Sequence, residues 1–276
     1  MDDESQSAQL AMPRLSTPFI FAMHVAFRLL WLLPLGAAVP LSRPAARPAA
    51  PARVLVPVEL FTSEGCSSCP AADALLRELT AAQPVPGVEI LALGEHVDYW
   101  NRLGWQDAFS QPAFTQRQHM YAEGFGSGSY TPQAVVGGRT ELVGHQREKL
   151  LAAIREAARA PQATVVLTAE AAGSTHRLQV RVSGAPAAGA QVLLAITESG
   201  LASQVGRGEN AGRLLRHAAV VRELRPLGTA TAAGTFAATV PVNVNSGWKT
   251  AGLRYVVLVQ ASVTHYITGA AVLPAE

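Results

Sequence analysis

Residues 54–82 have the sequence VLVPVELFTSEGCSSCPAADALLRELTAA. Val54 to Phe61 form an apolar run of β-branched and bulky side chains, a composition that favours a buried strand. A short turn, Thr62 to Gly65, follows this run. From Ser67 to about Ala82 apolar residues recur at helical spacing, and Pro70 stands in the first turn, where a helix tolerates proline. The stretch therefore predicts a strand, a turn and a helix, with two cysteines where the helix begins.

The elements after this helix continue an alternating pattern. Val88 to Leu93 form a second apolar run, and strand, helix and strand in succession predict a right-handed βαβ unit with parallel strands. Further helices are predicted from about Pro112 to Ala122 and from Arg147 to Ala160. Between them, a two-glycine turn within residues 133–143 is a hairpin signature. The order β-α-β-α-β-β-α predicts a thioredoxin-like α/β domain, a mixed sheet covered by helices, over residues 54–161.

The pattern changes after Pro161-Gln162. Residues 162–276 contain runs in which apolar and polar residues alternate between turn signals, and this half has no cysteine. Such runs predict a C-terminal, mostly antiparallel β domain, either a sandwich or a partly closed barrel. The predicted strands are Thr164–Ala169, Arg177–Ser183, Gln191–Thr197, Ala218–Leu224, Thr235–Val242 and Tyr255–Ser262.

The composition favours a globular protein without a charged partner. The chain has 276 residues, of which 49% are hydrophobic and 15% charged. Five of the 22 basic and three of the 20 acidic residues lie within residues 1–53, which leaves 17 of each from Val54 onward. Because residues 54–276 carry no net charge, there is no electrostatic reason to expect nucleic acid or an anionic membrane surface as a partner.

Residues 1–53 are predicted to be a targeting segment and a spacer. Arg28 precedes an apolar run, Leu29 to Val39, which ends in small residues and is too short for a comfortable transmembrane helix. This arrangement is typical of a secretory signal. Pro40 to Arg53 are rich in proline and alanine and predict a spacer. We therefore expect an extracytoplasmic protein, periplasmic or secreted; the alternative is an uncleaved segment that anchors it to the membrane.

Cys66 and Cys69 are the only cysteines of the chain, and a disulfide between them closes a loop of four residues. A disulfide that closes so short a loop stabilises the folded protein by about 2 kcal/mol in the chain-entropy model, near the low end for disulfides. This small gain argues against a purely structural role, and the position of the pair favours a redox role. Cys66 stands where a strand turns into a helix. The helix N-terminus favours its thiolate and makes it the attacking cysteine, reachable from outside. Cys69, one turn in, is better shielded and suited to resolve a mixed disulfide.

Three other roles compete for the cysteine pair. One is an inert surface disulfide. Structural zinc is disfavoured, because such sites need four ligands and the chain has no second cysteine pair. Copper is a stronger alternative, since soft thiolates and a nearby histidine can hold it; the candidate ligands are Cys66, Cys69 and His96.

His96 is the first candidate outside the cysteine motif. In an open α/β sheet, functional residues gather at the carboxyl ends of the parallel strands. His96 leaves the second parallel strand at that end, so we expect it to approach Cys66. There it would accept a proton from a thiol or bind a metal. The alternative is a packed histidine hydrogen-bonded to Asp98.

Pro132, Thr131 and Glu59 complete the candidate site. In the thioredoxin arrangement, the loop before the antiparallel hairpin carries a cis proline that faces the cysteines, and Pro132 holds this position. The Thr131 backbone would then pair with an extended peptide. Glu59, in the first strand, is predicted to be a buried carboxylate that shuttles the proton of the resolving cysteine. The alternative places Glu59 at a strand edge, pointing to solvent.

Six short motifs after the spacer form a recognisable set: Phe61–Pro70 with Ala72-Asp73, His96–Trp100, Leu103–Trp105, Tyr130–Gln133, Gly208–Gly212 and Val220–Arg222. Together they resemble an uncharacterised family of secreted thioredoxin-like proteins, domain of unknown function 1223. The resemblance covers most of the chain after the spacer. It implies a thioredoxin-like fold and an extracytoplasmic location, and it supplies no substrate.

The sequence therefore favours a thiol–disulfide oxidoreductase that acts on protein thiols or disulfides and needs no cofactor. Cys66 attacks a partner disulfide, Cys69 releases it, and Thr131 with Pro132 docks the partner chain. A copper-handling protein is the second hypothesis. The third is a non-catalytic interaction protein whose cysteine pair is vestigial and whose partner binds Gly206 to Arg216, a polar and basic segment.

Overall fold

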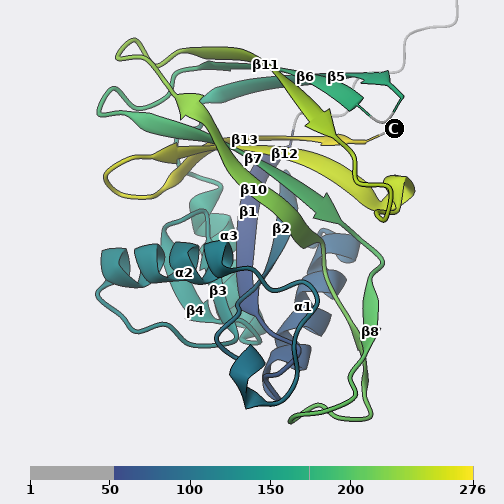
Figure 1. Ribbon diagram of the computed structural model, residues 1–276. Helices are drawn as coiled ribbons and strands as arrows, with labels where there is room; N and C mark the ends of the chain where they lie inside the picture. The colour runs from purple at the N-terminus through teal and green to yellow at the C-terminus, as the bar shows by residue number, and fades with distance from the viewer. Residues whose placement is uncertain (1–52, 174, 276) are drawn as a thin grey trace, which may run out of the picture. The chain divides into compact units, whose positions relative to one another are not determined.

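The computed structural model describes residues 53–275 except residue 174 (Figure 1). The predicted signal segment and spacer, residues 1–53, lie outside the described residues apart from Arg53. The described part of the chain belongs to one compact unit, which begins at Ala50. None of the helices in this part is both long enough and apolar enough to span a membrane.

The first half has the predicted order of elements. Strands β1 and β2 are parallel and in register from Val54 opposite Val88 to Thr62 opposite His96. Strand β3 is antiparallel to β1 and forms a hairpin with β4. The elements of this half are β1 (Val54–Thr62), α1 (Cys69–Ala82), β2 (Val88–His96), the 3-10 helix η1 (Asn101–Leu103), α2 (Pro112–Phe125), β3 (Gln133–Val136), β4 (Thr140–Val143) and α3 (Arg147–Ala157).

Helices cover both faces of the first-half sheet. Side chains of a strand alternate between the two faces. On one face, Val58, Leu60 and their neighbours pack against α1 and α3. On the other face, Leu91 and Leu93 pack with Phe114 of α2, and Phe61 packs with Tyr121 of the same helix. We call these the α1 face and the α2 face.

One sheet runs through both halves of the chain (Figure 1). It has eight strands in the order β13-β12-β7-β10-β2-β1-β3-β4. The join is made by β10, whose Val220 lies beside Gly94 of β2. A Cβ atom at Gly94 would lie 2.7 Å from the carbonyl oxygen of Ala218, so this close approach needs glycine. The predicted boundary at Pro161-Gln162 therefore does not separate two sheets.

The second half adds a second layer over part of the large sheet. The three-stranded sheet β11-β6-β5 packs on β7 and β12 through Leu178, Val180, Leu194 and Tyr255. This half is a two-layer antiparallel arrangement, and the alternative of a partly closed barrel is wrong, because β10 continues into the first-half sheet instead of closing on its own. Its elements are β5 (Thr164–Ala172), β6 (Thr175–Ser183), β7 (Ala190–Glu198), β8 (Ala202–Gln204), β9 (Leu214–Arg216), β10 (Val220–Thr229), β11 (Phe236–Asn243), η2 (Thr250–Gly252), β12 (Leu253–Ala261) and β13 (Ile267–Pro274).

Candidate functional site

The cysteine pair lies where β1 ends and α1 begins. Cys66 and Cys69 form a disulfide with their Cα atoms 5.4 Å apart. Cys66 is in the turn before the helix, and Cys69 is the first helical residue. The Sγ atom of Cys66 also lies 3.3 Å from the hydroxyl oxygen of Ser68. Ser67 and Ser68, between the cysteines, are exposed.

The expectation that Cys66 is reachable from outside is wrong. Cys66 is 1% exposed and Cys69 is 0% exposed. The cause is the β8–β9 loop, residues 205–213, which belongs to the second half of the chain. Asn210 of this loop is fully buried, and its side-chain amide donates to the carbonyl oxygens of Glu64 and Cys66, each at 2.9 Å.

Further contacts hold the β8–β9 loop in place. The backbone N–H of Ser67 donates to the carboxylate of Glu209 at 2.9 Å. Gly208 has a φ of +78°, which favours glycine, and a Cβ atom there would lie 3.4 Å from Cβ of Trp105. Figure 1 shows the β8–β9 segment running beside α1. The segment from Gly206 to Arg216, predicted to be a partner-binding surface, thus makes intramolecular contacts with the cysteine turn.

A cluster of buried polar side chains lies at the same end of the sheet. His96 ends β2 beside Thr62 of β1, Asp73 comes from the second turn of α1, and His217 follows β9. The two imidazole rings are 4.8 Å apart between centroids, edge to face. The Nδ1 atom of His217 lies 3.8 Å from Oδ1 of Asp73, an ion-pair distance that is too long for a hydrogen bond. We call these residues the Asp73–His96–His217 cluster.

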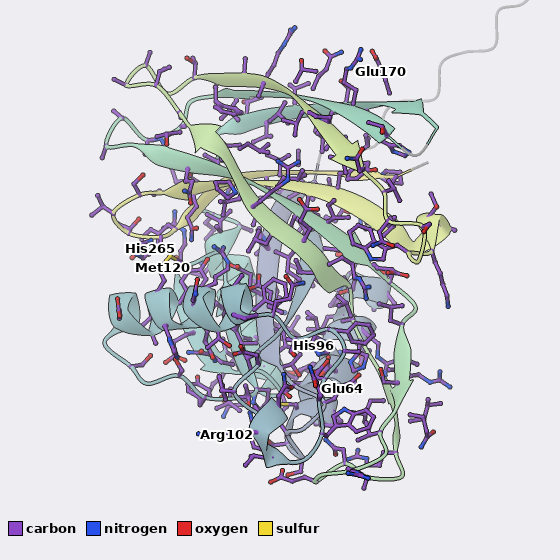
Figure 2. All side chains as sticks on the ribbon, in the orientation of Figure 1. Glu64, His96, Arg102, Met120, Glu170 and His265 are labelled. Atoms are coloured by element: carbon purple, nitrogen blue, oxygen red, sulfur yellow. A yellow bond between two sulfur atoms is a disulfide. The ribbon has the colours of Figure 1, made fainter. Side chains whose placement is uncertain are left out.

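A second polar group fixes each member of the cluster. Nδ1 of His96 lies 2.6 Å from a carboxylate oxygen of Asp107, and Nε2 of His217 lies 3.1 Å from Oε1 of Glu64. The hydroxyl of Thr62 donates to Oδ2 of Asp73 at 2.7 Å. Figure 2 labels His96 and Glu64, which lie close together at this end of the sheet. These contacts leave Nε2 of His96, Nδ1 of His217 and Oδ1 of Asp73 without a hydrogen-bond partner.

Two carboxylates change the titration of His217. Burial by itself lowers the pKa of His217, but Asp73 and Glu64 outweigh it and raise the pKa to about 9. At Asp107, burial raises the pKa, but the charge and hydrogen bond of His96 outweigh burial and lower it overall. The cluster is therefore a buried site of concentrated charge.

His96 reaches the predicted end of the sheet, but its partner differs from the predicted one. Asp107 contacts its Nδ1 atom, whereas Asp98 accepts a hydrogen bond from Thr115 at 2.5 Å. Asp107 also accepts from the backbone N–H groups of Glu64 and Phe109. The hypothesis of an Asp98-bonded histidine is therefore wrong, because Asp107 holds that position.

Pro132 has the predicted cis peptide bond with Thr131. Its carbonyl oxygen accepts a hydrogen bond from the N–H of Gly144. A Cβ atom at Gly144 would lie 3.1 Å from Ala72 of α1 and 3.5 Å from Pro132, so the proline lies beside the cysteine helix. The hydroxyl of Thr131 accepts from the indole N–H of Trp100 at 2.9 Å.

Glu59 lies on the face of the sheet opposite the cysteine helix. Its carboxylate accepts hydrogen bonds from Arg117 at 2.5 Å and from the hydroxyl of Tyr121 at 2.6 Å, both on α2. Neither the predicted proton shuttle to Cys69 nor the solvent-exposed alternative is correct, because Glu59 is fully buried on the α2 face.

Sequence reasoning missed most of the residues that surround the cysteines. Asp73 has a local signal, since it lies four residues after Cys69 and thus on the same face of α1. Glu209 and Asn210 occur in a segment that carries the family resemblance, although no local pattern places them over the cysteines. His217 has no such signal, because only the pairing of β10 with β2 brings it to this end of the sheet.

The fold and the site define the class of the protein: an α/β protein with a large mixed sheet and a buried Cys-x-x-Cys disulfide at its strand ends. The family model described as "Protein of unknown function (DUF1223)" matches residues 57–260, so the chain belongs to this family. A crystal structure of a structural genomics target from Agrobacterium tumefaciens is similar, with 28% identity and a TM-score of 0.62. The match covers 83% of this chain and 97% of that one.

Other comparisons add little. OgpA from Akkermansia muciniphila is 11% identical over 42% of this chain and 29% of its own, with a TM-score of 0.27. CsgH from R. palustris is 15% identical over 42% of this chain and 94% of its own, with a TM-score of 0.20. Both likenesses are too weak to carry an argument. None of the curated proteins matches the chain.

Proposed function

We propose that this protein is an extracytoplasmic thiol–disulfide oxidoreductase with a thioredoxin-like first half. The single observation that carries the proposal is the Cys66–Cys69 disulfide at the junction of β1 and α1. A disulfide that persists fits an oxidising compartment. The cis Thr131–Pro132 bond beside α1 also supports a thioredoxin-like first half.

The reaction is a two-step exchange of two electrons. In the reduced protein, the Cys66 thiolate attacks one sulfur of a partner disulfide, which forms a mixed disulfide and releases the first partner thiolate. The Cys69 thiolate then attacks Sγ of Cys66, which restores the Cys66–Cys69 disulfide and releases the second partner thiolate. The reverse sequence oxidises a partner dithiol. The reduction potentials of the two couples set the direction.

Exchange requires the β8–β9 loop to move. In the described conformation no partner sulfur can approach Cys66 along the line of the disulfide, because the sulfur is buried. The loop is attached to the cysteine turn through Asn210 and Glu209, and the exposed Ser67 and Ser68 already border solvent. We propose that a partner chain displaces the loop and then pairs with the backbone at Thr131.

Trapping of a mixed disulfide tests this function. A Cys69→Ser variant lacks the resolving thiol, so its Cys66 should stay linked to the partner, and addition of Asn210→Ala should increase the trapped amount. A matched Cys66→Ser variant lacks the attacking thiol and should trap nothing. Recovery of no mixed disulfide from cells that produce the Cys69→Ser or the doubly substituted protein would contradict the proposal.

The burial of the pair favours a second candidate, a non-catalytic interaction protein in which the disulfide only stabilises the cysteine turn. Cys66 and Cys69 are as buried as the core of the sheet. In this case, replacement of both cysteines by serine lowers stability by about 2 kcal/mol, and the native disulfide resists exchange with small thiols. Rapid exchange of the native disulfide would exclude this candidate.

A further inference from the structure

We propose that His96, His217 and Asp73 bind one divalent transition-metal ion of the zinc class. This site goes beyond the proposed exchange function, since none of its ligands is a cysteine. Donor atoms of the three residues all lie within 4.8 Å of one another, and all three side chains are buried. They come from three separate segments, β2, α1 and the residues after β9, which the fold brings to one point.

The unpaired polar atoms are the first support. Buried polar atoms almost always have a hydrogen-bond partner. Among the described residues, six buried side-chain atoms have none, and three of the six belong to this cluster: Nε2 of His96, Nδ1 of His217 and Oδ1 of Asp73. The last two face each other at 3.8 Å, an ion-pair distance into which a metal ion would insert. Two imidazole nitrogens and one carboxylate oxygen are a donor set that zinc and ferrous sites in proteins use.

The outer contacts are the second support. A histidine that binds a metal almost always has its other ring nitrogen bound to a carboxylate, a carbonyl or a water, which fixes the tautomer and aims the free nitrogen. Both histidines have such a carboxylate, Asp107 for His96 and Glu64 for His217. The hydroxyl of Thr62 holds the second oxygen of Asp73 in the same way. All three donors are thus oriented before an ion binds.

The spacing and the charge fit a divalent cation. Two donors on one tetrahedral zinc ion lie about 3.3 Å apart, so the 3.8 Å between His217 and Asp73 must shorten by about 0.5 Å, and separations of up to 4.8 Å within the cluster by up to about 1.5 Å. Three carboxyl groups, Glu64, Asp73 and Asp107, gather here and are at most 5% exposed. Burial of several negative charges is costly unless cations compensate them, and a divalent ion supplies that compensation.

A pocket gives the ion access and an open coordination position. Its lining includes Asp73 and His217 together with Ser63, Pro70 and Arg213. Three protein ligands and one open position are the pattern of catalytic zinc sites, whereas structural sites use four protein ligands. The fourth position therefore faces the pocket, where a water or a small anion can bind.

Zinc titration of the disulfide form tests the site, because sulfurs joined in a disulfide are unavailable as thiolate ligands. Calorimetry on chelator-treated protein should show one Zn²⁺ per chain. Asp73→Asn, which preserves the shape of the side chain, and His217→Gln should each weaken binding at least tenfold. His119→Ala, at an exposed histidine of α2, should leave it unchanged. Thermal unfolding of the metal-free variants shows whether they fold.

Cobalt spectra identify the ligands. Co²⁺ in place of Zn²⁺ should give ligand-field absorption without a thiolate-to-cobalt charge-transfer band, and a protein with both cysteines replaced by serine should give the same spectrum. This second variant separates the site from the proposed exchange activity, which it lacks. Absence of Zn²⁺ binding, with only a water among the three side chains, overturns the proposal. Zn²⁺ binding that survives Asp73→Asn in a folded variant also overturns it. A thiolate-to-cobalt charge-transfer band that requires the reduced cysteines overturns it as well, because such a band would indicate that Cys66, Cys69 and His96 bind the ion instead.

Discussion

Two buried polar clusters lie on opposite faces of the same sheet, and they differ in how their hydrogen bonds are satisfied. On the α2 face, Arg117 donates to Glu59, to the side-chain oxygen of Gln260 and to the hydroxyl of Tyr121. On the α1 face, three atoms of the Asp73–His96–His217 cluster are unpaired. The Arg117 network is hydrogen-bonded within the chain except at one oxygen of Glu95. In the Asp73–His96–His217 cluster, one atom of each member has no hydrogen-bond partner.

This difference separates a structural network from a candidate site. Glu95, whose Oε1 lies 3.7 Å from Nε of Arg117, has its other oxygen, Oε2, unpaired among the residues that the structure describes. Burial first, and the charge of Glu59 second, raise the pKa of Glu95, which favours the neutral acid and lowers the cost of burying it. On the α1 face, His217 and Asp73 compensate each other only through an ion pair of 3.8 Å, Nε2 of His96 has no hydrogen-bond partner, and the cluster borders a pocket.

The largest expected effect is on the Arg117 network. Arg117→Met leaves the buried carboxylate of Glu59 without its cation, so we expect a loss of about 3–5 kcal/mol in the free energy of unfolding. Urea denaturation measures the loss. The matched control is Arg159→Met, whose ion pair with Glu156 is exposed on both sides and should change stability by less than about 0.5 kcal/mol. A loss below about 1 kcal/mol in Arg117→Met would show that the network is not structural.

The next effect belongs to the Asp73–His96–His217 cluster. A ligand that binds only the folded state stabilises it by about 2.7 kcal/mol when its free concentration is one hundred times the dissociation constant. Zn²⁺ should therefore stabilise the disulfide form by about this amount, as measured by chemical unfolding with and without chelator. Asp73→Asn should remove the stabilisation. Equal stabilisation in both proteins would place the ion elsewhere.

A smaller change in stability is expected for the β8–β9 loop, which covers the cysteines. Asn210→Ala removes two hydrogen bonds to the carbonyls of the cysteine turn, so we expect a loss of about 2 kcal/mol in stability. Because loop opening precedes exchange, the same loss of about 2 kcal/mol should also make reduction of the disulfide by dithiothreitol about thirtyfold faster. Gln116→Ala, at an exposed position of α2, is the control and should change neither quantity. An unchanged reduction rate in Asn210→Ala would mean that the loop does not gate access.

The smallest effect concerns the pH dependence of stability. The folded-state pKa of Glu95 is raised above its unfolded value, so the stability contribution of the neutral acid is present below about pH 4.3 and is lost as pH rises through the raised pKa. Glu95→Gln should flatten this decline and raise stability at pH 8 relative to the unsubstituted chain. Unfolding at pH 4 and pH 8 measures it, with the exposed Glu123→Gln as control. A Glu95→Gln protein whose stability falls as steeply as that of the unsubstituted chain contradicts the assignment.

Local patterns were sufficient to predict the first half of the fold. The apolar run from Val54, the helical spacing after Cys69 and the glycine turn of the hairpin each determine structure within a few residues, and the observed order of elements agrees. The cis state of Pro132 and the position of His96 at the strand end also followed from this order.

Long-range pairing limited what could be predicted. Alternation in residues 218–224 predicts a strand but does not say which strand lies beside it, and the pairing of Val220 with Gly94 brings His217 next to His96. The burial of Cys66 depends on Asn210, which is far away in sequence. The sequence predicts a proton shuttle at Glu59 but does not determine which face of the strand the side chain occupies. In the structure it lies on the α2 face, where Arg117 donates to it.

The most direct test of the proposed function is the reduction potential of the Cys66–Cys69 couple, measured by equilibration with glutathione or dithiothreitol buffers. A disulfide that exchanges with partners should have a potential between about −120 and −270 mV, the range of known oxidoreductases. A value below about −300 mV, typical of structural disulfides, would contradict the account and leave the cysteine pair as a stabilising bridge under the β8–β9 loop.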